Sequence, residues 1–187
     1  MADHVTVLYE DLDRVLISRE EIAASVKELG KQITQDYAGK SPVLICILKG
    51  AVMFFADLIR NIDLPISLDF MAISSYGSST KTSGVVRILK DLDHDIANCD
   101  VVVVEDIVDS GLTLSYIQAL LDQRGARSVR IATLLDKPER RRSPLTVDYC
   151  CFTIPNEFVV GYGLDYDEKY RNLPDVGVLS PRIYAKE

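Results

Sequence analysis

The sequence has no tryptophan, only two histidines and no long apolar segment, and each shortage excludes a class of protein. With His4 and His94 as its only imidazoles, the chain has scarcely any base for a serine or cysteine catalytic triad. Its four cysteines form no C-x-x-C pair, so we expect reduced, buried thiols. No window reaches the roughly 18 apolar residues that span a bilayer, and the N-terminus does not resemble a targeting signal. We therefore expect a cytoplasmic protein without a membrane partner.

Positive charge is also in short supply. Lysine and arginine number 21 against 28 aspartates and glutamates, which gives a net charge of −7. A surface of this balance argues against nucleic acid as a partner. A small anionic substrate stays open, because a few local cations or one metal ion can override the net charge at a site.

The length and composition fit one soluble globular domain. The chain has 187 residues, of which 48% are hydrophobic and 26% charged, with no internal repeat and no break in composition. We expect residues 1–187 to form a single domain.

Apolar runs alternate with helical patterns along most of the chain. Ser18 and Glu21 have the spacing of a capping box at the start of a helix. Further segments are predicted as strands at Val43–Leu48, Ile66–Ile73, Val85–Lys90, Val101–Glu105 and Ser128–Asp136, and as helices at Ala51–Arg60 and Thr113–Arg124, with short strands in 146–152 and 158–163. This alternation is typical of an α/β fold with a mainly parallel sheet.

The most informative segment follows the four-valine strand. In Glu105–Thr113, three carboxylates and two hydroxyls open a helix, at the sheet edge where ligands of α/β proteins gather. A helix N-terminus offers unpaired N–H groups to a phosphate, and the adjacent acids suit ribose hydroxyls or a divalent cation. The pattern points to a sugar phosphate with a metal. The simpler alternative is that Asp109 or Ser110 only caps the helix while Gly111 makes the turn.

The segment VVVVEDIVDSGLTL resembles the phosphoribosyl pyrophosphate (PRPP) signature of the type I phosphoribosyltransferases. Five further motifs occur in the order and spacing of the hypoxanthine-guanine phosphoribosyltransferases, namely LKG at 48–50, SSYG at 74–77, DK at 136–137, FVVGYGLDY at 158–166 and YRNLP at 170–174. The resemblance covers nearly the whole chain. It implies a parallel sheet flanked by helices with a small hood formed by the chain-terminal segments, and a homodimer or homotetramer.

The resemblance also implies a role for each matching residue in PRPP binding. Glu105 and Asp106 would hold the ribose hydroxyls, directly or through Mg²⁺, and Asp109 would act as the general base near purine N7. The 5′-phosphate would be bound by Asp109, Ser110, Gly111, Leu112 and Thr113.

For the purine base, the resemblance assigns Lys137 to the 6-oxo group. A lysine donates hydrogen bonds and cannot accept them, so 6-oxopurines are expected in preference to adenine. Phe158 would stack on the purine ring and the Val159 backbone would read its 2-position. Without the resemblance, Lys137 is better interpreted as an exposed lysine and Phe158 as a core residue.

Pyrophosphate and Mg²⁺ are assigned in the same way. Lys49, Gly50 and Arg171 would bind pyrophosphate, and Asp165 would be a magnesium ligand beside it and near the base. The family often has a non-proline cis peptide in this loop, which makes the Leu48–Lys49 bond one to inspect. The polar segment Ser74–Gly84, with Ser75 and Tyr76 at matching positions, is expected to be a mobile lid that excludes water.

Two other functions stay open at this point. Asp91, Asp93 and Asp95 follow a strand and weakly resemble haloacid-dehalogenase-type phosphatases. Some proteins of the same fold are instead regulators that grip nucleic acid, which the acidic balance disfavours. The basic run 140–142 is interpreted as a solvated turn.

Overall fold

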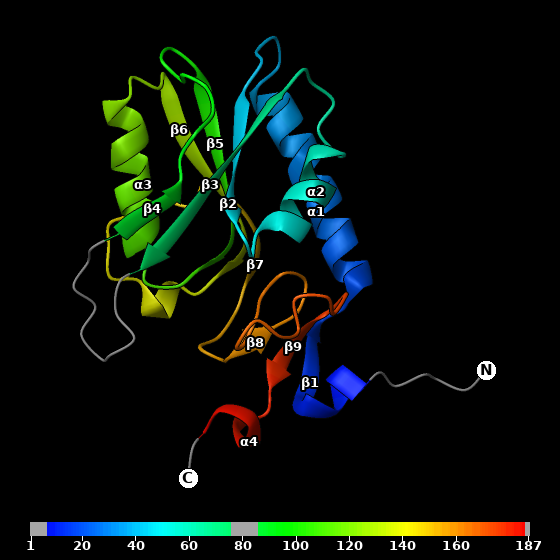
Figure 1. Ribbon diagram of the computed structural model, residues 1–187. Helices are drawn as coiled ribbons and strands as arrows, with labels where there is room; N and C mark the ends of the chain where they lie inside the picture. The colour runs from blue at the N-terminus through cyan, green and yellow to red at the C-terminus, as the bar shows by residue number, and fades with distance from the viewer. Residues whose placement is uncertain (1–6, 76–85, 186–187) are drawn as a thin grey trace.

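The computed structural model describes residues 7–75 and 86–185, which form a six-stranded sheet with helices on both faces and a smaller three-stranded sheet below it (Figure 1). The strand order of the large sheet is β4-β3-β2-β5-β6-β7. Its strands are β2 (Val43–Leu48), β3 (Ser67–Ser75), β4 (Val86–Lys90), β5 (Asp100–Val108), β6 (Ser128–Asp136) and β7 (Tyr149–Thr153). Every neighbouring pair is parallel except β3 and β4.

Two apolar layers hold the large sheet between its helices. α1 (Arg19–Asp36) and α2 (Val52–Ile59) cover one face, and α3 (Leu112–Gln123) covers the other (Figure 1). The strands are apolar on both sides, so Leu44 and Val104 pack toward α1 and α2 while Ile45 and Val103 pack toward α3. Burial on both faces explains why these strands appear in the sequence as continuous apolar runs.

α1 begins where the sequence predicts. The Ser18 backbone N–H donates to the Glu21 carboxylate at 2.8 Å, and the Ser18 hydroxyl accepts from the Glu21 backbone at 3.3 Å. This reciprocal capping box supplies partners for N–H groups that have none within the helix. None of the helices in the described part of the chain has the length and apolarity needed to cross a bilayer.

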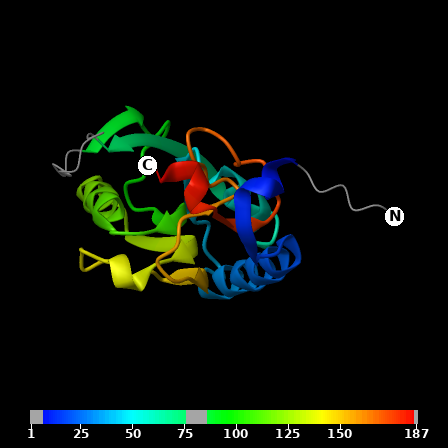
Figure 2. The same ribbon diagram turned by 90° about the horizontal axis from the view of Figure 1, so that it is seen from below.

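The smaller sheet joins the two ends of the chain and forms the hood. β1 (Leu12–Ile17) pairs with β9 (Val176–Leu179), and β9 pairs with β8 (Val159–Val160), all antiparallel. Two short elements flank it, the 3₁₀ helix η1 (Val7–Asp11) and the terminal helix α4 (Pro181–Tyr184). Seen from below in Figure 2, α4 and the segment from η1 to β1 lie at the hood end of the molecule.

The expected fold class is confirmed, with three differences in the elements. β5 runs through Val108, three residues beyond the predicted end at Glu105, so Asp106 lies within the strand rather than after it. β3 extends to Ser75, which places Ser74 and Ser75 in a strand and not in the expected loop. The sequence pattern also missed β1, in which apolar and charged residues are mixed, and β9, which has only four residues.

Candidate active site

The end of β5 and the start of α3 form the first of two adjoining cavities. This cavity has a volume of about 200 Å³ and is lined by Glu105, Ile107, Val108, Asp109, Ser110, Gly111, Thr113 and Leu114. The N-cap of α3 is Gly111, with φ +75°, so neither Asp109 nor Ser110 is the N-cap residue and Gly111 makes the turn. The Ser110 hydroxyl nevertheless accepts a hydrogen bond from the Leu112 backbone N–H, the first of α3, at 3.4 Å.

The second cavity lies between the large sheet and the hood. Its volume is about 420 Å³, and its lining comprises Ile107, Asp109, Lys137, Arg140, Asn156, Glu157, Phe158, Val159, Leu164 and Tyr184. Ile107 and Asp109 belong to both cavities. If one ligand fills both cavities, the part of the ligand that connects its two halves would therefore lie beside the Asp109 carboxylate.

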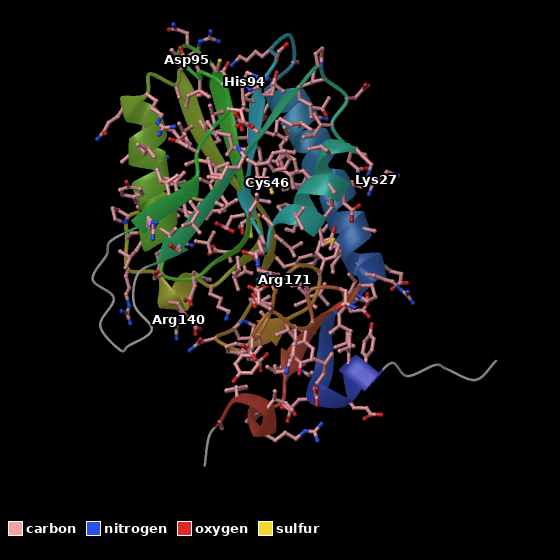
Figure 3. All side chains as sticks on the ribbon, in the orientation of Figure 1. Lys27, Cys46, His94, Asp95, Arg140 and Arg171 are labelled. Atoms are coloured by element: carbon pink, nitrogen blue, oxygen red, sulfur yellow. The ribbon has the colours of Figure 1, made fainter. Side chains whose placement is uncertain are left out.

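Asp109 is held by a residue that the sequence interpretation set aside. The Arg140 Nε donates to Asp109 Oδ1 at 2.7 Å, and both side chains are half exposed. Arg140 follows Lys137 in the 3₁₀ helix η2 (Pro138–Arg140), and Figure 3 shows it at the hood end of the large sheet. The pair engages one carboxylate oxygen, and among residues 7–75 and 86–185 no side chain or backbone group donates to Oδ2.

The neighbouring Arg141 stabilises the same turn through its side-chain contacts. Its guanidinium pairs with Asp136 at the end of β6 and donates to the Leu145 carbonyl at 3.0 Å. A side chain at Gly111 would overlap the Arg141 stem and the Ser143 hydroxyl. The prediction of a solvated turn for the run 140–142 is wrong for Arg141, whose side chain is 16% exposed and pairs with Asp136. Arg140 and Arg142 are exposed, although Arg140 pairs with Asp109.

The exposure of Lys137 and of Phe158 is the opposite of what their residue types alone predict. Lys137 is buried, with 8% of its surface exposed, and its Nζ donates to the Glu157 carbonyl at 2.6 Å. Loss of hydration lowers the pKa of this lysine, and the Asp109 carboxylate opposes the shift. Phe158, by contrast, is 40% exposed on the wall of the larger cavity.

Glu105 and Asp106 form a pair of neighbouring carboxylates with limited access to solvent. Burial is the main cause that raises the pKa of Glu105 well above its usual range, and the adjacent Asp106 charge adds to it. Burial raises the pKa of Asp106 as well. Gly50 packs directly on the Asp106 carboxylate, where any side chain would collide with it. Such a pair favours a cation or hydroxyl donors as its ligand.

The cations expected at the pyrophosphate position lie together and face carboxylates of the hood. Lys49 Nζ lies 3.1 Å from Glu168 Oε2, and Arg171 contacts Asp165 at 2.8 Å and Glu168 at 3.5 Å. Arg171 also donates to the Gly163 carbonyl at 2.8 Å, and Figure 3 shows it between sheet and hood. The Leu48–Lys49 peptide bond is cis, a feature that the resemblance to the family suggested for this loop.

The residues named for Mg²⁺ do not converge into one preformed site. Within residues 7–75 and 86–185, no three acidic, histidine or cysteine side chains gather closely enough to enclose a metal ion. Asp165 accepts from Arg171 and from the Glu168 backbone, at 2.8 and 2.9 Å. Glu105 and Asp106 form a separate oxygen group. Both groups have the hard carboxylate oxygens that Mg²⁺ prefers, together with water and substrate oxygens.

Several other expectations have a definite outcome. Figure 3 shows Asp95 and His94 at the end of the sheet remote from Arg140 and Arg171, which separates the acidic run 91–95 from both cavities. Of the free cysteines, Cys46 is buried but Cys150 is exposed. Tyr76 and most of the expected lid lie outside the described residues. Leu112 is exposed at the start of α3, and the Val159 backbone pairs with Val178.

Sequence reasoning missed six residues that line the larger cavity, namely Ile107, Arg140, Asn156, Glu157, Leu164 and Tyr184. Arg140 had a usable signal, since it lies one helical turn beyond Lys137 and follows the same strand end. Ile107 and Leu164 are ordinary apolar residues within the quoted motifs. Tyr184 belongs to a terminal segment without any motif.

Comparisons with known protein families, sequences and structures all find relatives of the same family. A sequence profile of the phosphoribosyl transferase domain matches residues 16–167. The hypoxanthine-guanine phosphoribosyltransferase of Streptococcus thermophilus strain CNRZ 1066 is 56% identical over 180 residues, which cover 96% of this chain and all of the relative. The enzyme of the same name from Streptococcus pneumoniae strain R6 is 52% identical over 179 residues, covering 96% and 99%. Among solved structures, a hypoxanthine phosphoribosyltransferase from Staphylococcus aureus in a tetragonal crystal form is similar with a TM-score of 0.95 and 49% identity, covering 98% of this chain and all of that one.

Proposed function

Because the chain belongs to the hypoxanthine-guanine phosphoribosyltransferase family of phosphoribosyl transferases, we propose that it transfers the 5-phosphoribosyl group of PRPP to N9 of hypoxanthine and of guanine. The products are IMP or GMP and pyrophosphate, and the reaction requires Mg²⁺. It returns free purine bases to the nucleotide pool.

The observation that carries this proposal is the pair of adjoining cavities that share Ile107 and Asp109. The smaller one opens onto the N-terminus of α3, whose N–H groups and positive end suit a phosphate. The larger one has an exposed aromatic ring and a buried lysine, which suit a flat oxo-heterocycle. A ribose at the junction would present C1′ to the heterocycle.

In this arrangement Ser110, Gly111, Leu112 and Thr113 bind the 5′-phosphate through backbone N–H groups and the hydroxyls of Ser110 and Thr113. Glu105 and Asp106 accept hydrogen bonds from the ribose hydroxyls. Burial deprives the Glu105 and Asp106 carboxylates of hydrating water and raises their pKa. When the substrate binds, its ribose hydroxyls donate hydrogen bonds to these carboxylates in place of that water.

Asp109 is the general base of the transfer. Purine N9 attacks C1′ while the bond from C1′ to the pyrophosphate oxygen breaks, and the electron pair of that bond leaves with pyrophosphate. The proton on N7 passes to the carboxylate of Asp109, whose Oδ2 is free while Oδ1 accepts from Arg140. Positive charge that develops on the ribose is stabilised by the nearby carboxylates.

Lys137 selects the base. Its ammonium group has three hydrogens and gives one to the Glu157 carbonyl, so others remain for the purine 6-oxo group. Adenine presents a donor at that position and would face the buried ammonium unfavourably. Phe158 stacks on the ring, and the Val159 backbone meets its 2-position.

Pyrophosphate is bound by Lys49, Gly50 and Arg171, together with Ser75 and Tyr76. The carboxylates that would hold Mg²⁺ are Asp165 and the pair Glu105 and Asp106, together with water and substrate oxygens, and the ion would supply neutralisation of phosphate charge. Lys49 and Arg171 exchange their carboxylate partners Glu168 and Asp165 for pyrophosphate oxygens.

A direct assay tests the function. The protein is incubated with PRPP, Mg²⁺ and one of four bases, and nucleotide and pyrophosphate are quantified. We expect turnover with hypoxanthine and guanine, none with adenine, and loss of activity when Mg²⁺ is chelated. PRPP binding without turnover of any base would contradict the proposal and favour a regulator, whose RNA binding would then fall steeply with salt.

We propose in addition that the chain forms a homodimer or homotetramer. Leu68, Leu89 and Met53, on β3, β4 and α2, leave 41%, 61% and 41% of their surfaces exposed, which suits an interface between copies. Light scattering during gel filtration measures the mass. A monomer at micromolar concentration would contradict this part of the proposal.

A further inference from the structure

Phe158 is one ring of a three-ring aromatic cluster that reaches the C-terminal helix. Its ring centroid lies 5.0 Å from that of Tyr184 with an interplanar angle of 24°, a stacked arrangement. Tyr166 meets Phe158 edge-on at 5.7 Å and Tyr184 at 6.4 Å. Both geometries fall in the range in which aromatic pairs attract each other beyond their buried area.

The last helix is fixed in place by the other end of the chain. The Ser180 backbone N–H donates to the Asp11 carbonyl at 2.9 Å, and Ile183 donates back to Ser180 at 2.9 Å. Arg182 donates to the Glu10 carbonyl and approaches Asp11 at 3.4 Å. Tyr184 is therefore carried by a segment anchored on η1, although α4 has only four residues.

Tyr184 belongs to the hood core and to the cavity at the same time. It packs, with Tyr166, against the buried cluster of Val160, Tyr170, Leu173 and Leu179. The same residue stands on the wall of the larger cavity beside Phe158. Ile107 and Leu164 supply other apolar parts of that wall. The stack with Tyr184 covers one face of the Phe158 ring, so a base that stacks on Phe158 has the other face available to it.

We propose that Tyr184 is a positioning residue, which fixes the ring plane of Phe158 before the purine base binds. An exposed phenylalanine without a neighbour samples several rotamers, and binding must restrict them. The stack with Tyr184 restricts them in the free enzyme. This inference rests on the proposed function, since it assumes that the base stacks on Phe158, and it gives the C-terminal segment a part in base recognition.

The test compares Tyr184→Ala, Tyr184→Leu and Tyr184→Phe with the wild type. Alanine removes the stack, leucine keeps apolar bulk without a ring, and phenylalanine keeps the ring. We expect the KM for hypoxanthine and the Kd of IMP to rise about 3–10-fold in the alanine and leucine variants. The KM for PRPP and kcat should change less than twofold, and the phenylalanine variant should match the wild type. Tyr116→Ala, on the exposed side of α3, is the matched control.

Each other outcome overturns the inference in its own way. An unchanged KM for hypoxanthine in the leucine variant shows that the stack does not position Phe158. A lowered KM shows that Tyr184 obstructs the base site. Equal rises in both KM values with a lower melting temperature show a structural role only. Absence of turnover in the wild type would instead remove the proposed function itself.

Discussion

At the scale of single residues, Asp109 stands where the two cavities meet, and its two oxygens have different surroundings. Arg140 engages Oδ1, and Oδ2 is left for a ligand. The carboxylate is thus oriented without being fully paired. A group with this geometry can accept a proton from a ring that approaches from the larger cavity.

Replacing Asp109 by asparagine keeps the size of the side chain and removes its ability to take a proton. We expect kcat to fall by about 10²–10⁴-fold, the usual contribution of a general base, while the Kd of PRPP changes little. Steady-state kinetics and calorimetric titration with PRPP measure the two quantities. An Asp109→Asn enzyme with normal kcat would remove Asp109 from the mechanism.

The contribution of Arg140 is predicted to be smaller because it acts through Asp109. An ion pair between half-exposed side chains contributes up to about 1 kcal/mol, so we expect Arg140→Ala to lower kcat about 2–5-fold. Arg140→Lys should restore part of the loss. Arg142 is exposed in the same turn and is the matched control. Equal kinetics for Arg140→Ala and Arg142→Ala would show that the pair has no part in orienting Asp109.

At the scale of elements, β5 and β6 bring the functional groups to one edge and are themselves held at the opposite end. Asp100 opens β5 with 5% of its surface exposed, accepts from Ser128 at 2.7 Å and from Arg127 at 3.0 Å, and lies 3.9 Å from Lys40. These donors lower the pKa of Asp100, with the Ser128 hydrogen bond as the largest cause. The carboxylate fastens the start of both strands.

A group whose pKa is lower in the folded than in the unfolded chain stabilises the fold above its unfolded pKa, and the benefit disappears as pH falls. We therefore expect Asp100→Asn to lower the free energy of unfolding by about 1.5–3 kcal/mol at pH 7, with a smaller difference below about pH 4. Urea unfolding at both pH values measures this. Asp122→Asn, on the exposed face of α3, is the control, and a loss that does not depend on pH would contradict the ionic interpretation.

The sequence predicts the elements that have a strong period and misses those defined by long-range pairing. β2, β6 and the start of α1 agree with the prediction to within a residue or two, because continuous apolar runs and a capping box are local signals. β1 mixes apolar and charged residues, β9 has only four residues, and the pairing of these two strands is not a local property. The pairing of Arg140 with Asp109 is also a long-range contact, although the position of Arg140 one helical turn beyond Lys137 is a local signal that could have suggested it.

At the scale of the whole molecule, the sheet and the hood meet through two glycines. Gly50, after β2, touches Asp106 on one side, and its carbonyl faces Gly163 of the hood on the other. Gly163 has φ +103°, a conformation that other residues rarely adopt, and a side chain there would overlap the Gly50 carbonyl. The hood can therefore approach the carboxylate pair as closely as backbone permits.

The Gly163→Ala substitution should increase the distance between the large sheet and the hood. We expect a loss of about 1–3 kcal/mol in the free energy of unfolding and a raised KM for PRPP, because the methyl group pushes the hood from Gly50. Gly39→Ala is a matched control with φ +74° and open space around it, so it carries the conformational cost without the collision. If both variants lose the same stability and keep the wild-type KM, close contact at this junction is unimportant for substrate binding.

The pairing of β1 with β9 has a consequence for biosynthesis. β9 follows every strand of the large sheet in the chain, so a ribosome-attached chain can assemble the large sheet while the hood is still missing its central strand. The hood wall of the larger cavity is therefore completed after the sheet wall, and a stop codon before β9 would leave the large sheet without that wall.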